Sequence, residues 1–235
     1  MSLKEQLPPG PEPVYLIDGS SFFYRSFHAN PDLKRSDGFP TNALYGVLRV
    51  LTRLMREEKP KYVGFFLDGR KPTFRHQLYP QYKANRPPMP EPLAAQIAPL
   101  KKAVELMGLP LTVSDGVEAD DCIASLAQAF KAQRPVVIVA SDKDLKQCLD
   151  GNVLLWDPSP KGDKLVRGAD LLAETGLTPG QWPDFQALTG DSTDNIPGLP
   201  GVGPKTALKI LADFPNLEAL RERFDQVPEK LRAKI

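Results

Sequence analysis

The stretch PVVIVASD at residues 135–142 decides the fold class, because the five apolar residues VVIVA are followed by an acid. A strand that is apolar on both faces is typical of a parallel sheet that lies between two layers of helices. Comparable runs are VYLID (14–18), KYVGFFLD (61–68), LPLTV (109–113) and NVLLWD (152–157). Segments with helical periodicity, such as residues 41–58 and 92–108, separate these runs. The sequence therefore predicts an α/β fold over about the first 160 residues.

Composition limits the class of protein. Hydrophobic residues make up 41% and charged residues 25% of the 235 residues, which is enough to bury a core and excludes a collagen-like or disordered chain. No apolar run approaches the length that crosses a bilayer, and the N-terminus has no signal-peptide pattern. We therefore expect a cytoplasmic protein without a membrane partner. Cys122 and Cys148 lack the spacing of metal ligands, so we expect reduced thiols.

The pattern along the chain predicts three parts. Residues 1–13 are predicted to be a flexible N-terminal tail, and residues 14–160 form the α/β core. Residues 161–235 contain short helical segments broken by Gly and Pro, which predicts a smaller helical region. The last residues, VPEKLRAKI, stop within a helical segment without a cap signal, so we expect this region to be incomplete at its C-terminus.

Acids follow the predicted strands. Asp18, Asp68 and Asp142 each end an apolar run, and in an open parallel sheet sites form beyond the carboxyl ends of the strands. Two further acidic segments are VEADD (117–121) and TGDSTDN (189–195). A single such Asp is more often a helix cap or a turn residue, but so many together favour a shared site. The nine candidates are Asp18, Asp68, Glu118, Asp120, Asp121, Asp142, Asp144, Asp191 and Asp194.

A cluster of that many carboxylates would be strongly destabilising without positive counter-charge. Oxygen ligands without nearby Cys or His favour Mg²⁺ or Mn²⁺ over zinc. Because one Mg²⁺ usually takes one or two carboxylates, the sequence predicts two or more ions. Paired ions roughly 3.5–4 Å apart are the arrangement that supports phosphodiester hydrolysis. The alternative for the VEADD segment taken alone is a solvated, acid-rich helix start.

Two further segments have features of nucleic-acid binding. Residues 69–90, GRKPTFRHQLYPQYKANRPPMP, combine Lys, Arg and aromatic residues without any acid, which suits contacts to phosphates and bases. The alternative is a solvated basic loop. Residues 198–210, GLPGVGPKTALKI, place glycines before a helix start, where backbone N–H groups approach a phosphate. The contacts predicted at this turn are Gly201, Gly203, Lys205 and Thr206.

Five blocks of the sequence, taken in order, resemble the 5′-nuclease domain of bacterial DNA polymerase I, which belongs to the flap endonuclease group. The blocks are VYLIDGSSFFYRSFHA (14–29), FFLDGRKPTFRHQLYPQYKANRPPMP (65–90), GVEADDCIASLA (116–127), VIVASDKDLKQC (137–148) and ALTGDSTDNIPGLPGVGPKTA (187–207). The resemblance implies a PIN-like, mostly parallel sheet flanked by helices. It also implies a helical arch within residues 69–92 and a C-terminal helix–turn–helix that binds DNA.

The resemblance also implies an activity. The expected enzyme is a two-metal 5′-3′ exonuclease and flap endonuclease that acts in replication and repair. Its expected partner is DNA with a 5′ flap, nick or overhang. We further expect a monomer at the bacterial nucleoid, with a polymerase domain as a candidate continuation of the full-length chain and K⁺ as a candidate ion at the helix–turn–helix.

Carried over by position, the resemblance assigns roles to individual residues. One metal would be held by Asp18, Asp68, Glu118 and Asp120, with Asp121 close by, and the other by Asp142, Asp144, Asp191 and Asp194. Lys83 and Arg86 would be catalytic residues at the scissile phosphate, and Tyr82 would stack on an unpaired base. Arg25 and Arg75 are candidate DNA contacts, although Arg25 equally fits an exposed helix charge.

Two other functions remain open from the residues alone. One is a PIN-type ribonuclease. The basic aromatic stretch and the glycine turn favour a protein that acts on DNA junctions over this alternative. The other is a non-catalytic protein that binds DNA structures. The complete set of acids disfavours that alternative, because carboxylates that face phosphates weaken binding.

Overall fold

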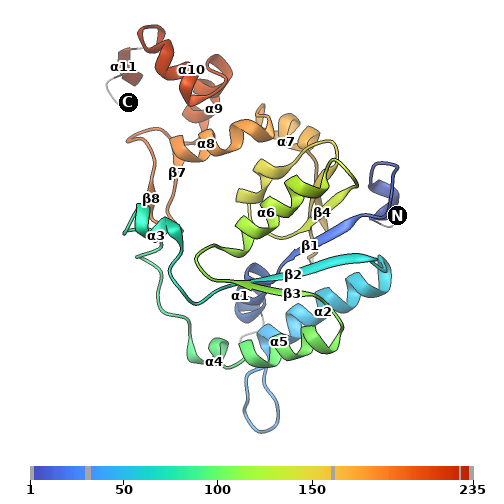
Figure 1. Cartoon of the computed structure of the whole chain (residues 1–235). Helices are drawn as coiled ribbons and strands as arrows, with labels where there is room; N and C mark the ends of the chain where they lie inside the picture. The colour runs from blue at the N-terminus through green and yellow to red at the C-terminus, as the bar shows by residue number, and fades with distance from the viewer. Residues whose placement is uncertain (1–2, 30–32, 160–161, 228, 233–235) are drawn as a thin grey trace. The chain divides into compact units, whose positions relative to one another are not determined.

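The computed structural model describes residues 3–29, 33–159, 162–227 and 229–232, and the chain divides into two compact units (Figure 1). Unit 1 consists of Met1–Phe74 and Pro88–Arg167, and unit 2 of Arg75–Pro87 and Gly168–Ile235. The boundaries between these two units differ from the domain boundaries that the sequence predicted. Residues 75–87, which the sequence assigned to an arch within the core, group with the helical unit.

A six-stranded sheet with the order β3-β2-β1-β4-β5-β6 forms the centre of unit 1. The strands are β1 (Val14–Asp18), β2 (Tyr62–Asp68), β3 (Leu111–Ser114), β4 (Val136–Val139), β5 (Val153–Asp157) and β6 (Lys164–Val166). The first five are parallel, and β6 is antiparallel to β5. The predicted α/β fold with a mostly parallel sheet is confirmed. The sequence missed β6, because three residues are too few to show a strand pattern.

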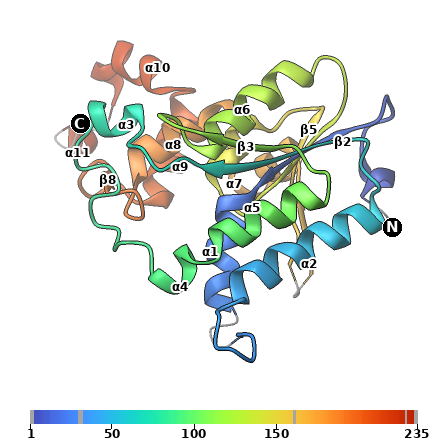
Figure 2. The same ribbon diagram turned by 60° about the horizontal axis from the view of Figure 1, so that its bottom comes forward.

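Helices cover both faces of this sheet, with α6 on one face and α1, α2 and α5 on the other (Figure 2). They are α1 (Gly19–Ala29), α2 (Asn42–Glu57), α4 (Glu91–Ala94), α5 (Ile97–Leu106) and α6 (Ala119–Phe130), with short 3₁₀ helices η1 (Lys4–Gln6) and η2 (Asp144–Cys148). Every residue of β1 is buried, as expected for a central strand between two helical layers. Tyr15 and Ile17 pack in one cluster with Val47, Leu51 and Leu54 of α2. The helix predicted at residues 92–108 is divided into α4 and α5.

The strand order reverses at β1. The chain runs from β1 to β2 and β3 on one side and returns to place β4 on the other side of β1. In open α/β sheets, ligands bind beyond the carboxyl ends of the strands at such a switch point. Asp18 is the last residue of β1, so the fold places it at this point.

Unit 2 is mostly helical, which confirms the predicted helical character of the C-terminal region. Its elements are α3 (Phe74–Leu78, of which Phe74 belongs to unit 1), α7 (Gly168–Thr175), η3 (Pro179–Gln181), α8 (Trp182–Thr189), β7 (Gly190–Asp191), β8 (Ile196–Pro197), α9 (Pro204–Asp213), α10 (Leu217–Glu222), η4 (Phe224–Gln226) and α11 (Glu229–Arg232). Strands β7 and β8 form a short antiparallel pair. None of the helices in the described ranges is both long and apolar enough to span a membrane.

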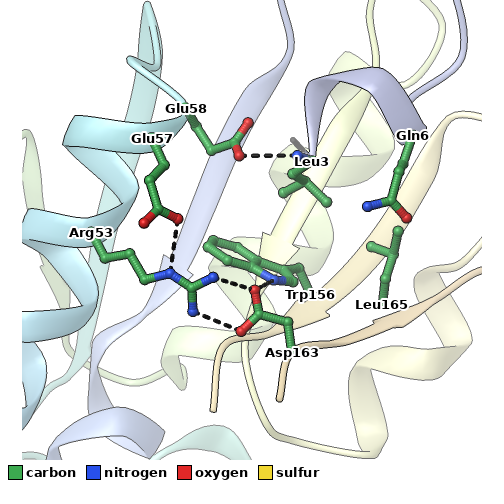
Figure 3. Close-up of a pocket in the computed structure, with 8 residues that line it drawn as sticks. All are labelled: Leu3, Gln6, Arg53, Glu57, Glu58, Trp156, Asp163 and Leu165. Carbon is green, nitrogen blue, oxygen red and sulfur yellow. Dashed lines mark hydrogen bonds and ion pairs between the residues drawn. The ribbon is translucent and has the colours of Figure 1, made fainter. Parts of the chain in front are cut away.

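The N-terminal segment packs onto unit 1 instead of forming the predicted flexible tail. Leu3 is 6% exposed and lies in the main hydrophobic cluster. The backbone N–H of Leu3 donates to the buried Glu58 carboxylate at 3.0 Å (Figure 3). The Lys4 backbone N–H and the Tyr15 hydroxyl donate to the same carboxylate at 3.2 and 3.3 Å. The sequence missed this anchor because Glu58 is more than fifty residues away from its backbone partners.

A pocket of about 450 Å³ lies next to this anchor, and its charged groups pair with one another (Figure 3). The Arg53 guanidinium donates two hydrogen bonds of 2.7 Å to Asp163 and one of 2.9 Å to Glu57. The Trp156 indole also donates to Asp163. Burial alone would raise the pKa of Asp163, but the hydrogen bonds and charge of Arg53 outweigh it and lower the pKa. This network ties the end of α2 to the β5–β6 edge.

Replacing Glu58 by Ala should lower the free energy of unfolding by about 2 kcal/mol, because the buried Tyr15 hydroxyl and the Leu3 amide lose a charged acceptor. Urea denaturation at pH 7 measures this loss. Glu12→Ala is the matched control, since it removes an exposed acid whose ion pair with Lys4 is worth less than about 1 kcal/mol. Equal losses in the two variants would contradict the role of Glu58 as an anchor.

Candidate active site

Seven of the nine predicted acids lie at the carboxyl edge of the sheet in unit 1. Asp18 and Asp68 are the last residues of β1 and β2, and Asp142 follows the end of β4. The parallel pairing of β1 with β2 and β4 places these three strand ends at one edge. The other four acids belong to the segments that follow β3 and β4, namely Glu118, Asp120, Asp121 and Asp144.

Two glycines fix the chain directly after the first two acids. A Cβ atom at Gly19 would lie 2.3 Å from the Phe65 ring, and one at Gly69 would lie 2.4 Å from the Ser114 carbonyl oxygen. Real Cβ atoms do not approach this closely, so a side chain at either position would push the neighbouring strand away. Glycine at both positions therefore lets the chain after Asp18 and Asp68 lie directly against the neighbouring strand.

Asp18 is the most deeply buried acid of this edge, with 5% of its surface exposed. Burial raises its pKa to about 6, hydrogen bonding by Ser21 opposes the rise, and the negative charges of Asp68 and Asp142 add to it. The Ser21 backbone N–H donates to Asp18 Oδ1 at 3.0 Å, so Asp18 also supports the start of α1. Asp68 and Asp142 are thus close enough to Asp18 for their charges to act on it.

Asp68 connects three elements at this edge. Its Oδ1 accepts a hydrogen bond of 2.8 Å from the Ala119 N–H, at the N-terminus of α6. Its own backbone N–H donates to Ser20 Oγ at 2.9 Å, in the first turn of α1. A carboxylate at a helix N-terminus is stabilised by the helix dipole, which partly offsets the repulsion from the other acids.

The acidic triplet at the start of α6 has two roles. Glu118 and Asp121 form a capping box, in which the Glu118 N–H donates to Asp121 Oδ2 at 2.9 Å and the Glu118 side chain accepts from the Asp121 backbone. Capping therefore explains part of this acid-rich turn. The half-buried Asp120 is not part of the capping box. Its charge acts on Cys148, whose pKa is raised to about 11 by burial and by Asp120.

The acids after β4 form a turn of their own. The Asp144 N–H donates to Asp142 Oδ1 at 2.9 Å, and Lys143 Nζ lies 3.7 Å from Asp144 Oδ1. Within the described ranges, no three His, Cys, Asp or Glu side chains are grouped closely enough to form a metal site by themselves. The donor set is nevertheless all oxygen and partly solvated, which fits a hard cation that keeps several waters and takes one or two carboxylates.

The two remaining acids lie in unit 2, where Asp191 ends β7 and Asp194 lies in the turn before β8. Asp191 Oδ1 accepts a hydrogen bond of 2.8 Å from the Thr193 N–H, which is a common turn arrangement. The Asp194 carboxylate accepts 3.0 Å from the Tyr82 hydroxyl, lies 3.8 Å from Lys83 Nζ and pairs with the Arg86 guanidinium. The structure therefore brings three predicted DNA-facing residues together around one predicted metal ligand.

Of three further predicted DNA contacts, Tyr82 and Arg25 have partners inside their own units and Arg75 is half-buried. The Tyr82 ring is 5% exposed and lies 4.8 Å from Lys83 Nζ, so base stacking by Tyr82 stays a prediction. Arg25 donates to Asp157 and to the Pro158 carbonyl, which makes it a structural ion pair in this conformation. Arg75 is half-buried in α3.

The glycine turn before α9 leaves a helix N-terminus without a side-chain cap. Gly203 is the N-cap residue, and no atom lies within 4 Å of the position where its Cβ would be. Gly201 has a positive φ of 71°, which favours glycine. Lys205 is exposed, and the Thr206 N–H donates to the Gly203 carbonyl at 3.0 Å. The surface at this helix start is thus open on the Gly203 side.

Two kinds of supporting residue were not predicted. Ser21 donates its backbone N–H to Asp18, and Ser20 accepts from the backbone N–H of Asp68. The Asp-x-x-Ser pattern of a helix start could have indicated Ser21. Asn85 and Asn195 join residues 81–86 to residues 191–195 in unit 2. No local pattern indicates that pairing, because the partners are over a hundred residues apart.

Comparison with known families extends over the whole chain. Residues 13–176 match the family described as 5′-3′ exonuclease, N-terminal resolvase-like domain, and residues 177–235 match 5′-3′ exonuclease, C-terminal SAM fold. The chain belongs to the 5′-3′ exonuclease family. This confirms the resemblance and identifies the chain as a nuclease of the exonuclease and flap endonuclease group.

Relatives of this exonuclease include complete nucleases and parts of longer enzymes. It is 42% identical to a 5′-3′ exonuclease of Aquifex aeolicus over 94% of this chain and 76% of that protein. It is 45% identical to DNA polymerase I of Pseudomonas aeruginosa over 92% of this chain and 24% of that protein. The chain therefore spans about a quarter of the length of that polymerase.

Solved structures support the fold of the exonuclease. The T5 5′-exonuclease, described with bound zinc ions, matches with a TM-score of 0.77 at 23% identity and covers 92% of this chain and 81% of that one. The catalytic core of Rad2 in complex with DNA substrate matches with a TM-score of 0.61 at 15% identity, over 96% of this chain and 70% of that one. The PIN-like sheet with a C-terminal helical region is thus shared with these nucleases.

Removing the charge of Asp18 should stabilise the metal-free exonuclease at pH 8. Its pKa is about 6 in the folded protein against 3.8 in the unfolded chain, so stability falls as the pH rises from about 4 to about 6 and stays low above that. Asp18→Asn should therefore raise the free energy of unfolding at pH 8, by on the order of 2 kcal/mol, and by less at pH 5.

Thermal unfolding in EDTA across this pH range measures the effect. Asp213→Asn, which removes an exposed acid of α9, serves as the control and should change stability by less than about 0.5 kcal/mol. If the gain in Asp18→Asn is the same at pH 5 and pH 8, burial and repulsion do not act on Asp18 as described.

Proposed function

We propose that this nuclease hydrolyses DNA at 5′ flaps, nicks or overhangs, with two or more Mg²⁺ or Mn²⁺ ions at the carboxyl edge of unit 1. One observation carries the proposal, namely that Asp18 and Asp68 end neighbouring strands, Asp142 follows a third, and the charges of Asp68 and Asp142 both act on Asp18. Carboxylates in such a cluster require positive charge to stay ionised together. The exonuclease and DNA polymerase names of the relatives support a DNA substrate.

The ions would be held by residues from several strand ends. Asp18, Asp68 and Asp120 are the proposed ligands of one ion, and Asp142 and Asp144 of the other. Glu118 and Asp121 already cap α6, so they support the first group through the helix start as well as through charge. Asp191 and Asp194 of unit 2 are the remaining predicted ligands. Divalent ions bound there would activate a water and stabilise the charge on the leaving oxygen.

Residues of unit 2 would act on the DNA itself. Lys83 and Arg86 are the proposed catalytic cations, because two positive groups beside one carboxylate can turn to a phosphate that approaches them. Arg75 is a proposed contact to the strand, and Tyr82 a proposed stacking residue once it leaves its present packing. Arg25 would contact a phosphate only after exchanging its ion pair with Asp157.

The turn before α9 is the proposed contact to duplex DNA. Its open glycine positions and exposed Lys205 suit a phosphate backbone, which is bound without regard to sequence. The proposed contacts are Gly201, Gly203, Lys205 and Thr206, with K⁺ as the proposed monovalent ion. A monomer at the bacterial nucleoid is part of the same proposal, and the DNA polymerase I relatives support a polymerase domain in the full-length chain.

Replacing Asp68 or Asp120 by Asn should lower flap cleavage by at least about 100-fold, because a charged ligand of the metal is lost. Affinity for the same DNA should be unchanged or higher, since the substitution removes a negative charge near phosphates. A 5′-labelled DNA flap in Mg²⁺ gives the rate, and a binding titration in Ca²⁺ gives the affinity. The matched control is Asp213→Asn, which should leave both unchanged.

The same assay separates the alternatives. An RNA flap of identical sequence that is cleaved faster than the DNA flap would favour a ribonuclease. Binding without cleavage in Mg²⁺, or cleavage that persists in EDTA, would overturn the metal-dependent nuclease. Near-normal rates in either Asn variant would remove that residue from the proposed ligands.

A further inference from the structure

Two segments of unit 2 that lie far apart in sequence are joined by a compact group of hydrogen bonds. Residues 81–86 carry the proposed catalytic cations, and residues 191–195 are the end of β7 and the turn that leads to β8. Both backbone and side-chain groups take part. The bonds are Lys83 N–H to Asp194 O (2.9 Å), Asn85 Nδ2 to Ser192 O (2.8 Å), Arg86 Nε to Thr193 O (3.2 Å) and Asn195 Nδ2 to Gln81 O (2.8 Å). We name this group the amide clamp.

The backbone of Lys83 is strained, and the amide clamp keeps it in that strained conformation. Lys83 has a φ of 55°, in the left-handed region that residues with a Cβ atom rarely adopt. Such a conformation persists where the surrounding contacts hold it, and it concentrates at functional sites. Asn195 has a similar φ of 58°, but asparagine tolerates this region far better than lysine does. The backbone strain is therefore greater at Lys83, whereas Asn195 adopts its own left-handed conformation at low cost.

The conformation of Lys83 decides where its charge lies. The ammonium is 4.8 Å from the centre of the Tyr82 ring and 3.8 Å from Asp194 Oδ2. The Arg86 guanidinium meets the other oxygen of the same carboxylate. A relaxed backbone at Lys83 would turn the side chain away from this group. Lys83 and Arg86 therefore both lie beside the Asp194 carboxylate. Most of the hydrogen bonds that keep them there are made by the other groups of the amide clamp.

We propose that Asn85 and Asn195 are positioning residues, whose amides hold residues 81–86 so that Lys83 and Arg86 point to the scissile phosphate. Neither amide touches the reacting atoms in this assignment. Asn195 holds the carbonyl of Gln81 ahead of Lys83, and Asn85 holds the carbonyl of Ser192 next to Arg86. The inference rests on the proposed function, because it adds to that function the residues that aim its cations.

Asn195→Gly is the sharpest variant, because glycine accepts the left-handed backbone and only the amide is lost. Single-turnover cleavage of a saturating 5′-flap DNA in Mg²⁺ should slow by about 10-fold, since misplacement of a preorganised charge costs rate more than affinity. The salt dependence of DNA binding in Ca²⁺ should not change, because both cations remain. Asn85→Ala should show the same pattern.

A double-mutant cycle distinguishes positioning from a general structural effect. In a background with both Lys83→Ala and Arg86→Ala, Asn195→Gly should slow cleavage by less than about 3-fold, because both cations that the amide positions are gone. Hydrogen exchange of the Lys83 amide, which donates to the Asp194 carbonyl, should be at least about 10-fold faster in Asn195→Gly than in wild type. The control is Asn152→Ala, which removes a 2.9 Å amide bond to the Lys131 carbonyl in unit 1 and should leave the rate within about 2-fold.

The results of these experiments distinguish a failure of the positioning role from a failure of the proposed function. If wild type cleaves the flap and Asn195→Gly slows cleavage equally in both backgrounds, or not at all, the positioning role is overturned and the nuclease stands. If wild type leaves the flap intact in Mg²⁺, the proposed function fails, and the role of the amides fails with it. A loss of rate in Asn152→Ala as large as that in Asn195→Gly would also overturn the positioning role, because the effect would then be structural.

Discussion

Repulsion between carboxylates that end neighbouring parallel strands is the constraint on which unit 1 depends. The strand order reverses at β1, so Asp18 lies between the ends of β2 and β4 and is acted on by Asp68 and Asp142. Gly19 and Gly69 let the chain after Asp18 and Asp68 lie directly against the neighbouring strands. The protein offsets this repulsion only in part, through the N-termini of α1 and α6. What remains is an edge suited to bind hard cations.

Unit 2 contains the opposite arrangement, in which cations gather around one acid. Lys83, Arg86 and the Tyr82 hydroxyl all contact Asp194, and the amide clamp holds the segment that carries them. A phosphate is the ligand that such cations bind most readily. The strained backbone at Lys83 indicates that this gathering is not the lowest-energy local conformation and is maintained by the rest of the unit.

The sequence predicted the sheet and its acidic edge because both depend on local pattern. Apolar runs on both faces identify parallel strands, and acids at their ends are placed together by topology alone. The sequence did not predict the docking of Leu3 on Glu58, the strand β6, or the amide clamp. The first and last are pairings between distant residues, which leave no periodic signal, and β6 is too short to show one. The burial of Tyr82 within residues 69–90 was not predicted either, because a buried tyrosine looks the same in sequence as an exposed one.

Metal binding to the carboxyl edge is the central claim, and thermal unfolding measures it without relying on activity. Ligands that bind only the folded state raise its stability in proportion to the logarithm of their concentration. Titration of wild type with Mn²⁺ at pH 7.5 should raise the melting temperature progressively, and a variant with Asp18, Asp68 and Asp120 all replaced by Asn should lose most of that rise. The same Mn²⁺-dependent rise in both proteins would contradict the account, because the ions would then be held elsewhere.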